Sequence, residues 1–208
     1  KVKNGSLFIA LKGKHNDGYR YIDEAIENGA SAILANSRKV YTEKDIPIFN
    51  VPNVRQAMSK IASNFYKNPS KNLNLIGVTG TNGKTTMCCI INHILLDNNI
   101  NSASLGTLGY INSSNIISTG FTTPEAIDLQ QIMYTAVNGG IENITMEVSS
   151  HSINMHRVDD IDINTAIFTN ITPEHLDYHK TMDSYLKTKK MLFKNLNSNN
   201  ISIINNDD

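Results

Sequence analysis

Residues 80–86, GTNGKTT, are the part of the sequence with the clearest chemical potential. The apolar run Leu75–Thr79 precedes them, and Lys84–Leu96 follows with a helical apolar pattern, which predicts a strand, a glycine-rich turn and a helix. The backbone N–H groups of such a turn, together with the positive end of the helix, bind phosphate groups. Lys84 adds a point charge, and the Thr85 hydroxyl is a suitable Mg²⁺ ligand. We therefore expect a nucleotide site with ATP as its ligand.

The spacing of this segment differs by one residue from the common GxxxxGK[ST] pattern, which would place a glycine where the chain has Val78. The alternative interpretation is a glycine-rich turn with a solvated lysine. Because both glycines, Lys84 and Thr85 keep their positions relative to the strand and the helix, the pattern favours the phosphate site.

Polar residues also follow two later apolar runs. Thr145–Val148 carries Glu147 near its end, and Thr165–Thr169 is followed by TPEH at 172–175. That tetrapeptide is typical of a helix start with threonine as N-cap, which would place His175 one turn into the helix. Since parallel strands end at one edge of a sheet, Glu147 and His175 are both expected near the phosphate loop, where the carboxylate of Glu147 is a suitable Mg²⁺ ligand and His175 is a candidate functional residue. A salt-bridged glutamate and a structural histidine are the alternatives.

The segment Met182–Leu196 has its apolar residues on one helical face, and Lys189 falls at the centre of that face. Burying an ammonium group is costly, and burial lowers the pKa of a lysine. One interpretation is that Lys189 extends its charge to the surface. The other is that the neutral amine is carbamylated by CO₂ and becomes an anion able to bind Mg²⁺.

The first third of the chain predicts a small α/β domain. Strands and helices alternate along it, with apolar runs at 7–10, 31–35 and 46–51 and helical patterns at 19–28 and 54–66. The polar segment 67–74 contains a proline and has no periodicity, so we interpret it as a linker. The first domain is therefore expected over residues 1–70.

From residue 75 onward the same alternation continues. Strands are expected at 75–79, 102–105, 143–148, 165–169 and 201–204, and helices at 84–96, 124–137 and 182–196. Such alternation predicts a mostly parallel sheet covered by helices on both faces. The fold class is thus α/β: a small N-terminal domain, then a P-loop-type central ATP-binding domain over 71–208 whose sheet is incomplete.

Composition excludes several classes of protein. The 208 residues carry 19 Lys+Arg and 19 Asp+Glu, so a generally basic nucleic-acid binder is not expected. No apolar run approaches the roughly 18 residues of a membrane helix. The two cysteines, Cys88 and Cys89, are adjacent and cannot staple the fold, so we expect them to be small core residues. These features predict a cytoplasmic protein without a membrane partner.

With these residues assembled, the chain resembles the Mur ligases, the ATP-dependent amide-forming ligases of peptidoglycan synthesis, and among them most the MurE type. The resemblance covers essentially the whole chain. It rests on TGTNGKTT at 79–86, TTP at 122–124, MEVSSH at 146–151 with Arg157, FTNITPEHLDYH at 168–179, YLKTKKMLF at 185–193 and the stretch 7–34.

The resemblance implies roles for individual residues. The ATP-binding residues would be Gly80, Thr81, Asn82, Gly83, Lys84, Thr85 and Thr86. The catalytic residues would be Lys84, Glu147, His175 and Lys189, with Thr85, Glu147, His175 and carbamylated Lys189 as Mg²⁺ ligands. The substrate-binding residues would be Lys14, His15, Asn16, Thr122, Thr123, Ser149, Met155 and Arg157. Met155 stands where relatives often have glutamine.

The resemblance also implies a reaction. ATP would activate the D-glutamyl carboxylate of UDP-N-acetylmuramoyl-L-alanyl-D-glutamate as an acyl phosphate, which meso-diaminopimelate or L-lysine would then attack. Because the family's chains are more than twice as long, this chain is expected to lack the C-terminal domain that selects the amino acid and to be inactive alone. A monomer is expected. The alternatives are another amide ligase of this fold, similar to folylpolyglutamate synthases, and a non-catalytic or regulatory P-loop nucleotide-binding module.

Overall fold

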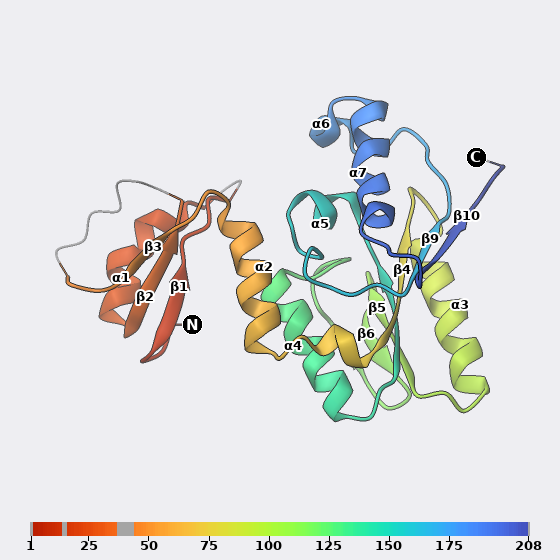
Figure 1. The fold of residues 1–208 in the computed structure, drawn as a ribbon, viewed down its shortest axis with the longest axis horizontal. Coiled ribbons are helices and arrows are strands. Elements are labelled where there is room, and N and C mark those ends of the chain that lie inside the picture. Colours follow the sequence, from red (N-terminus) through yellow and green to blue (C-terminus); the bar gives the residue numbers. More distant parts are fainter. Residues whose placement is uncertain (1, 14–15, 37–43, 208) are drawn as a thin grey trace. The chain divides into compact units, whose positions relative to one another are not determined.

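The computed structural model describes residues 2–13, 16–36 and 44–207, and the chain forms two compact units, Lys1–Met58 and Ser59–Asp208 (Figure 1). The division falls within helix α2 (Val54–Phe65), whereas the sequence places the boundary near residue 70. The expected linker lies in the second unit, where the short 3₁₀ helix η2 (Pro69–Asn72) buries its first two residues. The assignment of functional domains stays a prediction.

The first unit is a three-stranded parallel sheet with one short helix. Its strands, in the order β1-β2-β3, are β1 (Ser6–Ile9), β2 (Ala30–Ala35) and β3 (Ile48–Asn50). The helical pattern at 19–28 forms a 3₁₀ turn, η1 (Gly18–Tyr21), followed by α1 (Ile22–Glu27). Ile22, Ala25 and Ile26 of α1 share an apolar core with Ile33 of β2. The predicted strand, helix, strand order is therefore confirmed.

The second unit is built on a seven-stranded sheet in the order β10-β9-β4-β8-β5-β6-β7. Its strands are β4 (Asn74–Thr79), β5 (Ser102–Gly106), β6 (Gly109–Asn112), β7 (Ile116–Ile117), β8 (Asn143–Glu147), β9 (Thr165–Phe168) and β10 (Ile201–Ile204). Neighbours from β10 to β5 pair in parallel, and β6 and β7 are antiparallel additions. The mostly parallel sheet is thus confirmed, while β6 and β7 were not predicted.

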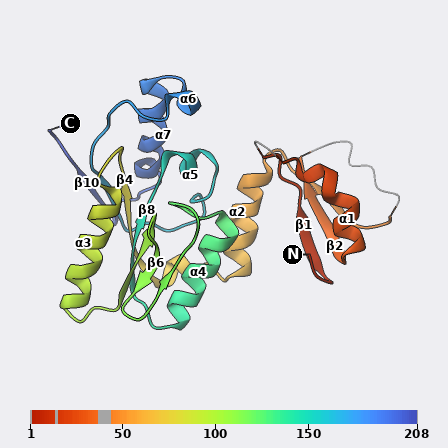
Figure 2. The same cartoon turned by 180° about the vertical axis from the view of Figure 1, so that it is seen from behind.

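Helices cover both faces of this sheet. They are α3 (Lys84–Asp97), α4 (Ala126–Asn138), α5 (Ser150–Asn154), α6 (Leu176–His179) and α7 (Met182–Lys194). On one face Val78 packs with Cys88 of α3, and on the other Leu75 shares a core with Met133 of α4 and Leu192 of α7. Figures 1 and 2 show α3 and α4 on opposite sides of the strands. Alternate residues of β4 therefore serve opposite cores.

The parallel strands bring their carboxyl ends to one edge of the sheet. Val78 of β4 lies beside Glu147 of β8, and Thr79 lies beside Phe168 of β9. Segments far apart in the sequence meet at this edge, which is where α/β sheets place their ligands. No helix within the described part of the chain is long and apolar enough to cross a membrane.

Candidate active site

The phosphate loop predicted from the sequence lies between β4 and α3. Gly80 has a φ of 151° and Gly83 a φ of 83°, both in the region that favours glycine. A Cβ on Gly80 would collide with the Thr169 hydroxyl and would lie 3.1 Å from the amide nitrogen of Asn170. Both glycines are therefore required, one by its close approach to the end of β9 and one by the turn into α3.

Residues after β9 fix the backbone of this loop. The Thr81 N–H donates to the Asn170 carbonyl at 2.9 Å, and the Asn82 N–H donates to Asn170 Oδ1 at 2.8 Å. The Thr169 hydroxyl donates to the Asn82 carbonyl at 2.7 Å. The loop is thus held by a neighbouring strand end as well as by its own turn.

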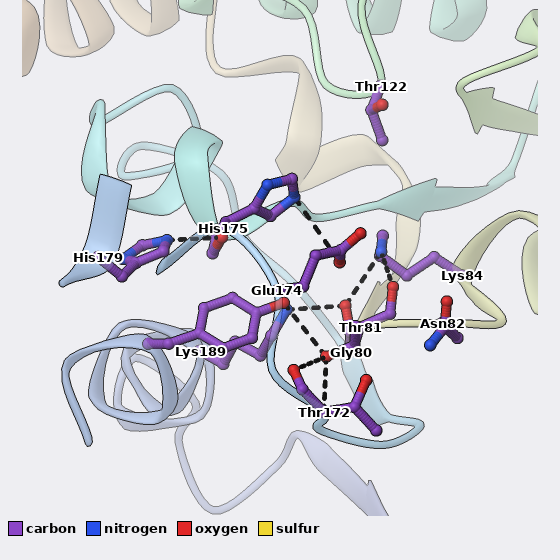
Figure 3. A network of polar contacts seen from close by, with 12 residues as sticks. Gly80, Thr81, Asn82, Lys84, Thr122, Thr172, Glu174, His175, His179 and Lys189 are labelled. Atoms are coloured by element: carbon purple, nitrogen blue, oxygen red, sulfur yellow. Dashed lines mark hydrogen bonds and ion pairs between the residues drawn. The ribbon is translucent and has the colours of Figure 1, made fainter. Parts of the chain in front are cut away.

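Two lysines share one carbonyl oxygen of the loop, as Figure 3 shows. Lys84 Nζ donates to the Gly80 carbonyl at 3.0 Å and to the Thr81 carbonyl at 2.7 Å. Lys189 Nζ reaches the same Gly80 carbonyl at 2.7 Å from α7. Two ammonium groups therefore lie close together at the strand-end edge of the sheet.

Lys189 is 1% exposed, as the apolar face of its helix predicts, so the interpretation in which it reaches the surface is wrong. Its ammonium lies 4.5 Å from the centre of the Tyr185 ring. Burial, reinforced by the positive charge of Lys84, lowers the pKa of Lys189 from 10.5 to about 7. A large fraction of this amine is neutral at physiological pH.

Glu147 is 2% exposed at the end of β8. Its Oε1 accepts from the Thr85 hydroxyl at 2.9 Å and from the Thr107 N–H at 2.8 Å. The Thr107 hydroxyl donates to Oε2 at 3.4 Å. No ion pair to Glu147 occurs among the described residues, so the salt-bridge interpretation is wrong there. Neutral donors keep this carboxylate in place beside the loop.

His175 lies next to the loop, but the predicted helix start is wrong. His175 has a φ of 55° and is itself the N-cap of α6, which begins at Leu176. The reason is that Thr172 is already tied to the loop: its N–H donates to Thr81 Oγ1 at 3.0 Å, and its carbonyl accepts from that hydroxyl at 3.2 Å. Both backbone groups of Thr172 therefore bond to the loop, and the helix begins four residues later, at Leu176.

Aromatic side chains surround His175. Its ring meets the His151 ring edge-on with 4.8 Å between centres, and its Nε2 lies 3.7 Å from Glu174 Oε2. His179 is buried, and its Nε2 is hydrogen-bonded to the Ser150 hydroxyl at 2.9 Å. Burial, followed by the neighbouring imidazoles, lowers the pKa of His151 and of His179. The rings of His151 and His179 are therefore biased toward the neutral form.

The residues expected to hold an acceptor substrate form a second group beside Glu147. The Thr123 hydroxyl donates to the Glu147 carbonyl at 2.8 Å. Arg157 donates to the Thr123 carbonyl at 2.8 Å, to Glu125 Oε1 at 2.6 Å and to Met155 Sδ at 3.6 Å. Its guanidinium is thus fixed in place by three neighbouring groups.

One cavity of about 310 Å³ joins the phosphate loop, Glu147, His175 and Lys189 with Thr122 and Ser149, whereas Thr123, Met155 and Arg157 do not line it. It is lined by Thr81, Asn82, Gly83, Lys84, Thr85, Thr107, Thr122, Glu147, Ser149, Ser150, Glu174, His175, Tyr185 and Lys189. All four predicted catalytic residues therefore line one cavity, although their roles stay predictions. Thr86 is exposed on α3, and Asn16 is exposed in the first unit. Lys14 and His15 lie outside the described residues.

The donor set suits a magnesium ion better than a metal held by protein alone. Within the described ranges, no three His, Cys, Asp or Glu side chains could hold a metal together. Mg²⁺ is usually bound through one or two carboxylates and the phosphates of a nucleotide. The Glu147 carboxylate beside the Thr85 hydroxyl and the phosphate loop fits that pattern.

Sequence reasoning missed three contributors to this site. Gly106, the last residue of β5, and Thr107, which follows it, both meet Glu147. Tyr185 is hydrogen-bonded to the Thr81 hydroxyl at 3.2 Å. The signal for Thr107 was available, because β5 ends at the same sheet edge as β8. Cys88 is a core residue as expected: it is 2% exposed, and burial raises the pKa of its thiol.

A parallel sheet whose strand, glycine-rich loop and helix carry a lysine and a threonine at the helix start defines a P-loop type of fold. The chain belongs to the Mur ligase family: the model of the Mur ligase middle domain matches residues 78–208, and that of the Mur ligase family catalytic domain matches residues 1–66. This agrees with the resemblance found in the motifs.

Curated relatives match the chain from end to end. The chain is 45% identical to the UDP-N-acetylmuramoyl-L-alanyl-D-glutamate–2,6-diaminopimelate ligase of Caldanaerobacter subterraneus subsp. tengcongensis, over 100% of the chain and 42% of that protein. It is 42% identical to UDP-N-acetylmuramyl-tripeptide synthetase 2 of Oceanobacillus iheyensis, over 100% of the chain and 43% of that protein. The chain thus spans less than half the length of these relatives.

Solved structures show the same fold. A UDP-N-acetylmuramoyl-L-alanyl-D-glutamate–2,6-diaminopimelate ligase matches with a TM-score of 0.86 at 30% identity, over 100% of this chain and 42% of the other. The MurF ligase of Thermotoga maritima in complex with ADP matches with a TM-score of 0.64 at 26% identity, over 100% of this chain and 44% of the other.

Proposed function

We propose that the protein is an ATP-dependent ligase of peptidoglycan synthesis. It would add a diamino acid, meso-diaminopimelate or L-lysine, to UDP-N-acetylmuramoyl-L-alanyl-D-glutamate. The observation that carries the proposal is the single cavity in which the phosphate loop meets Glu147, His175 and buried Lys189. Family membership and the names of the relatives support it. A cytoplasmic, monomeric enzyme is part of the proposal.

The phosphate loop would hold ATP. Loop residues Thr81, Asn82 and Gly83 line the same cavity as Lys84 at the N-terminus of α3, and the positive end of the helix together with the lysine charge favours a polyphosphate. Lys84 would exchange its loop carbonyls for phosphate oxygens. Since the loop backbone is fixed by Asn170, it would position the γ-phosphoryl group with little rearrangement.

Thr85, Glu147 and His175 would hold Mg²⁺, as the donor set allows. When bound, the metal would neutralise charge on the transferring phosphoryl group. Glu147 is oriented by neutral hydrogen-bond donors.

Lys189 would act as a carbamate. Its neutral amine would attack CO₂, forming an N–C bond and releasing one proton, so that a cation becomes an anion. The lowered pKa of Lys189 supports this step because only the neutral amine reacts. A ¹³C-bicarbonate NMR experiment should give a carbamate signal that is absent in Lys189→Met. No signal in the wild-type protein at pH 8 would contradict the carbamate.

The resemblance to the Mur ligases supplies the reaction that we propose for this site. The D-glutamyl carboxylate would attack the γ-phosphorus and release ADP, and the amine of the diamino acid would then displace phosphate and form the amide. Thr122, Thr123, Ser149 and Arg157 would hold the peptide end of the nucleotide substrate, with Met155 beside them. Lys14, His15 and Asn16 of the N-terminal domain would contact its uridine.

The test is ADP release by the natural protein with UDP-N-acetylmuramoyl-L-alanyl-D-glutamate and each diamino acid, with the product identified by mass. Omitting the D-glutamate from the acceptor should abolish the stimulation, and Lys84→Ala should abolish turnover. A folate acceptor that stimulates instead would indicate a folylpolyglutamate synthase-like ligase. A rate of ATP hydrolysis that no acceptor changes would indicate a regulatory P-loop ATPase.

A further inference from the structure

We propose that Gly106 and Thr107, at the end of β5, are positioning residues that orient the Glu147 carboxylate and couple it to Thr122. The proposal rests on the proposed function, in which Glu147 binds a metal and Thr122 binds the acceptor. Hereafter Gly106 and Thr107 are called the carboxylate cradle. They join the nucleotide side of the cavity to its acceptor side.

Gly106 provides the space that the carboxylate occupies. Leu105 pairs with Met146, so Gly106 and Glu147 are the next residues along two adjacent strands. A Cβ on Gly106 would lie 2.7 Å from both Cγ and Cδ of Glu147 and still closer to Oε1. Real Cβ atoms do not approach other atoms so closely, and both strands are fixed by the sheet. Any side chain at position 106 would therefore displace Glu147.

Thr107 supplies donors to both carboxylate oxygens. Its N–H donates to Oε1 at 2.8 Å and its hydroxyl to Oε2 at 3.4 Å. Thr85, on the loop side, donates to Oε1 at 2.9 Å. A carboxylate with donors on both oxygens has one orientation, and groups that orient a metal ligand affect metal affinity.

The same hydroxyl also reaches Thr122, with 3.0 Å between the two Oγ1 atoms. An ionised carboxylate only accepts hydrogen bonds, so the single proton of Thr107 is directed to Glu147. Thr107 Oγ1 must then accept the proton of Thr122. The result is a chain of hydrogen bonds in which Thr122 donates to Thr107 and Thr107 donates to Glu147. A displacement of Thr122 would therefore change the position of the hydroxyl that donates to Glu147.

The test compares Thr107→Val, which removes the hydroxyl and keeps the shape and the N–H, with Thr107→Ser, which keeps the hydroxyl. Mn²⁺ binding to the natural protein is measured by EPR with a non-hydrolysable ATP analogue present. Thr107→Val should weaken Mn²⁺ binding by about tenfold or more, and Thr107→Ser should restore it. Thr135→Val, the same change at an exposed position of α4, should leave Mn²⁺ binding unchanged.

Two further variants keep the proposal testable if Thr107→Val fails to fold by circular dichroism. Gly106→Ala should weaken Mn²⁺ binding by displacing Glu147, and Thr122→Val should weaken acceptor binding. Where Thr107→Val folds, it should weaken acceptor binding as well, and in the double variant Thr107→Val/Thr122→Val the two losses of acceptor affinity should not add, because the residues share one hydrogen bond. The acceptor affinity is read by calorimetry with UDP-N-acetylmuramoyl-L-alanyl-D-glutamate.

Three results would overturn the proposal. The first is wild-type Mn²⁺ affinity in Thr107→Val, and the second is a Thr107→Ser variant that binds Mn²⁺ as weakly as the valine variant. The third is strictly additive losses of acceptor affinity in the double variant. A wild-type protein that binds no Mn²⁺ would overturn it as well. Failure of the proposed function has a different signature. In that case the wild-type protein binds Mn²⁺ and the ATP analogue but forms no amide, and the Mn²⁺ comparison among the variants still decides the role of the cradle.

Discussion

Glu147 and Lys189 are both buried ionisable side chains, but they differ in how many hydrogen-bond partners surround them. Both side chains lie at the strand-end edge of the sheet and are 2% and 1% exposed. The carboxylate accepts from two hydroxyls and one N–H. The ammonium has one hydrogen-bond acceptor among the described residues, the Gly80 carbonyl, and shares it with Lys84.

The difference shows how a fold selects the chemistry of a buried group. Several neutral donors stabilise the charged form of an acid and keep it ready as a ligand. A single shared carbonyl, with a second ammonium nearby, does not offset the desolvation of Lys189, and so its pKa falls to about 7. The surroundings of Glu147 therefore hold its carboxylate with several donors, and those of Lys189 favour a neutral amine that is open to modification.

Glu147→Gln removes the buried carboxylate charge and should have the largest effect on amide formation. Its amide N–H₂ would face the Thr85 and Thr107 donors, and the negative charge would be lost. Because changes one shell away from a metal already cost about 10–100-fold, we expect amide formation to fall by more than about a hundredfold. ADP release measures this, with Glu142→Gln at an exposed position as the control. A near wild-type rate would remove Glu147 from the mechanism.

Lys189→Met should separate activity from stability. Amide formation should fall by at least about tenfold if the carbamate binds the metal. The free energy of unfolding should rise by roughly 1–4 kcal/mol, because an apolar side chain suits this buried position better than a poorly compensated charge. Coupled assays and urea unfolding measure the two effects. Lys190→Met, exposed on the same helix, should change neither, and a less stable Lys189→Met would contradict the comparison.

The lowered pKa of Lys189 should be visible in how the free energy of unfolding changes with pH. Its pKa is about 7 in the folded chain and about 10.4 in an unfolded one, so between these values the unfolded chain binds more protons. The free energy of unfolding should therefore rise from about pH 7 to about pH 10 in the wild-type protein relative to Lys189→Met. Urea unfolding at several pH values tests the sign. A flat or falling difference between the two proteins would contradict the lowered pKa.

Tyr185→Phe should have the smallest effect. It keeps the ring that faces Lys189 and removes the hydroxyl that bonds Thr81 at 3.2 Å. We expect a loss of about 0.5–1.5 kcal/mol in unfolding free energy and an unchanged pKa for Lys189. Urea unfolding and the pH series measure both. A shifted pH profile would mean that the hydroxyl, rather than burial, affects the amine.

The sequence predicted the elements whose patterns are local. Lys84 is one example: the strand, glycine-rich loop and helix around it can be predicted because the turn residues and the apolar periodicity indicate the same structure. The burial of Lys189 follows from the same periodicity, since its apolar neighbours recur on one helical face.

Features that depend on contacts between residues far apart in the sequence were harder to predict. The helix start expected at TPEH fails because Thr172 bonds Thr81, which lies far away in the sequence. For the cradle at Gly106 and Thr107, the predicted strand at 102–105 indicated the correct edge of the sheet, but the pairing of β5 with β8 that brings the cradle to Glu147 is not visible in a single segment. The short antiparallel strands β6 and β7 lack enough residues for a clear alternation.

The two edges of the larger sheet differ in their openness to other chains. β7 contains only two residues, and so short an edge offers little to pair with. At the other edge, Ile201, Ile203 and Ile204 of β10 are 57%, 50% and 61% exposed, and β10 pairs on one side only among the described strands. The unpaired side of β10 therefore presents backbone N–H and C=O groups with which a further strand can pair, whereas β7 closes the opposite edge.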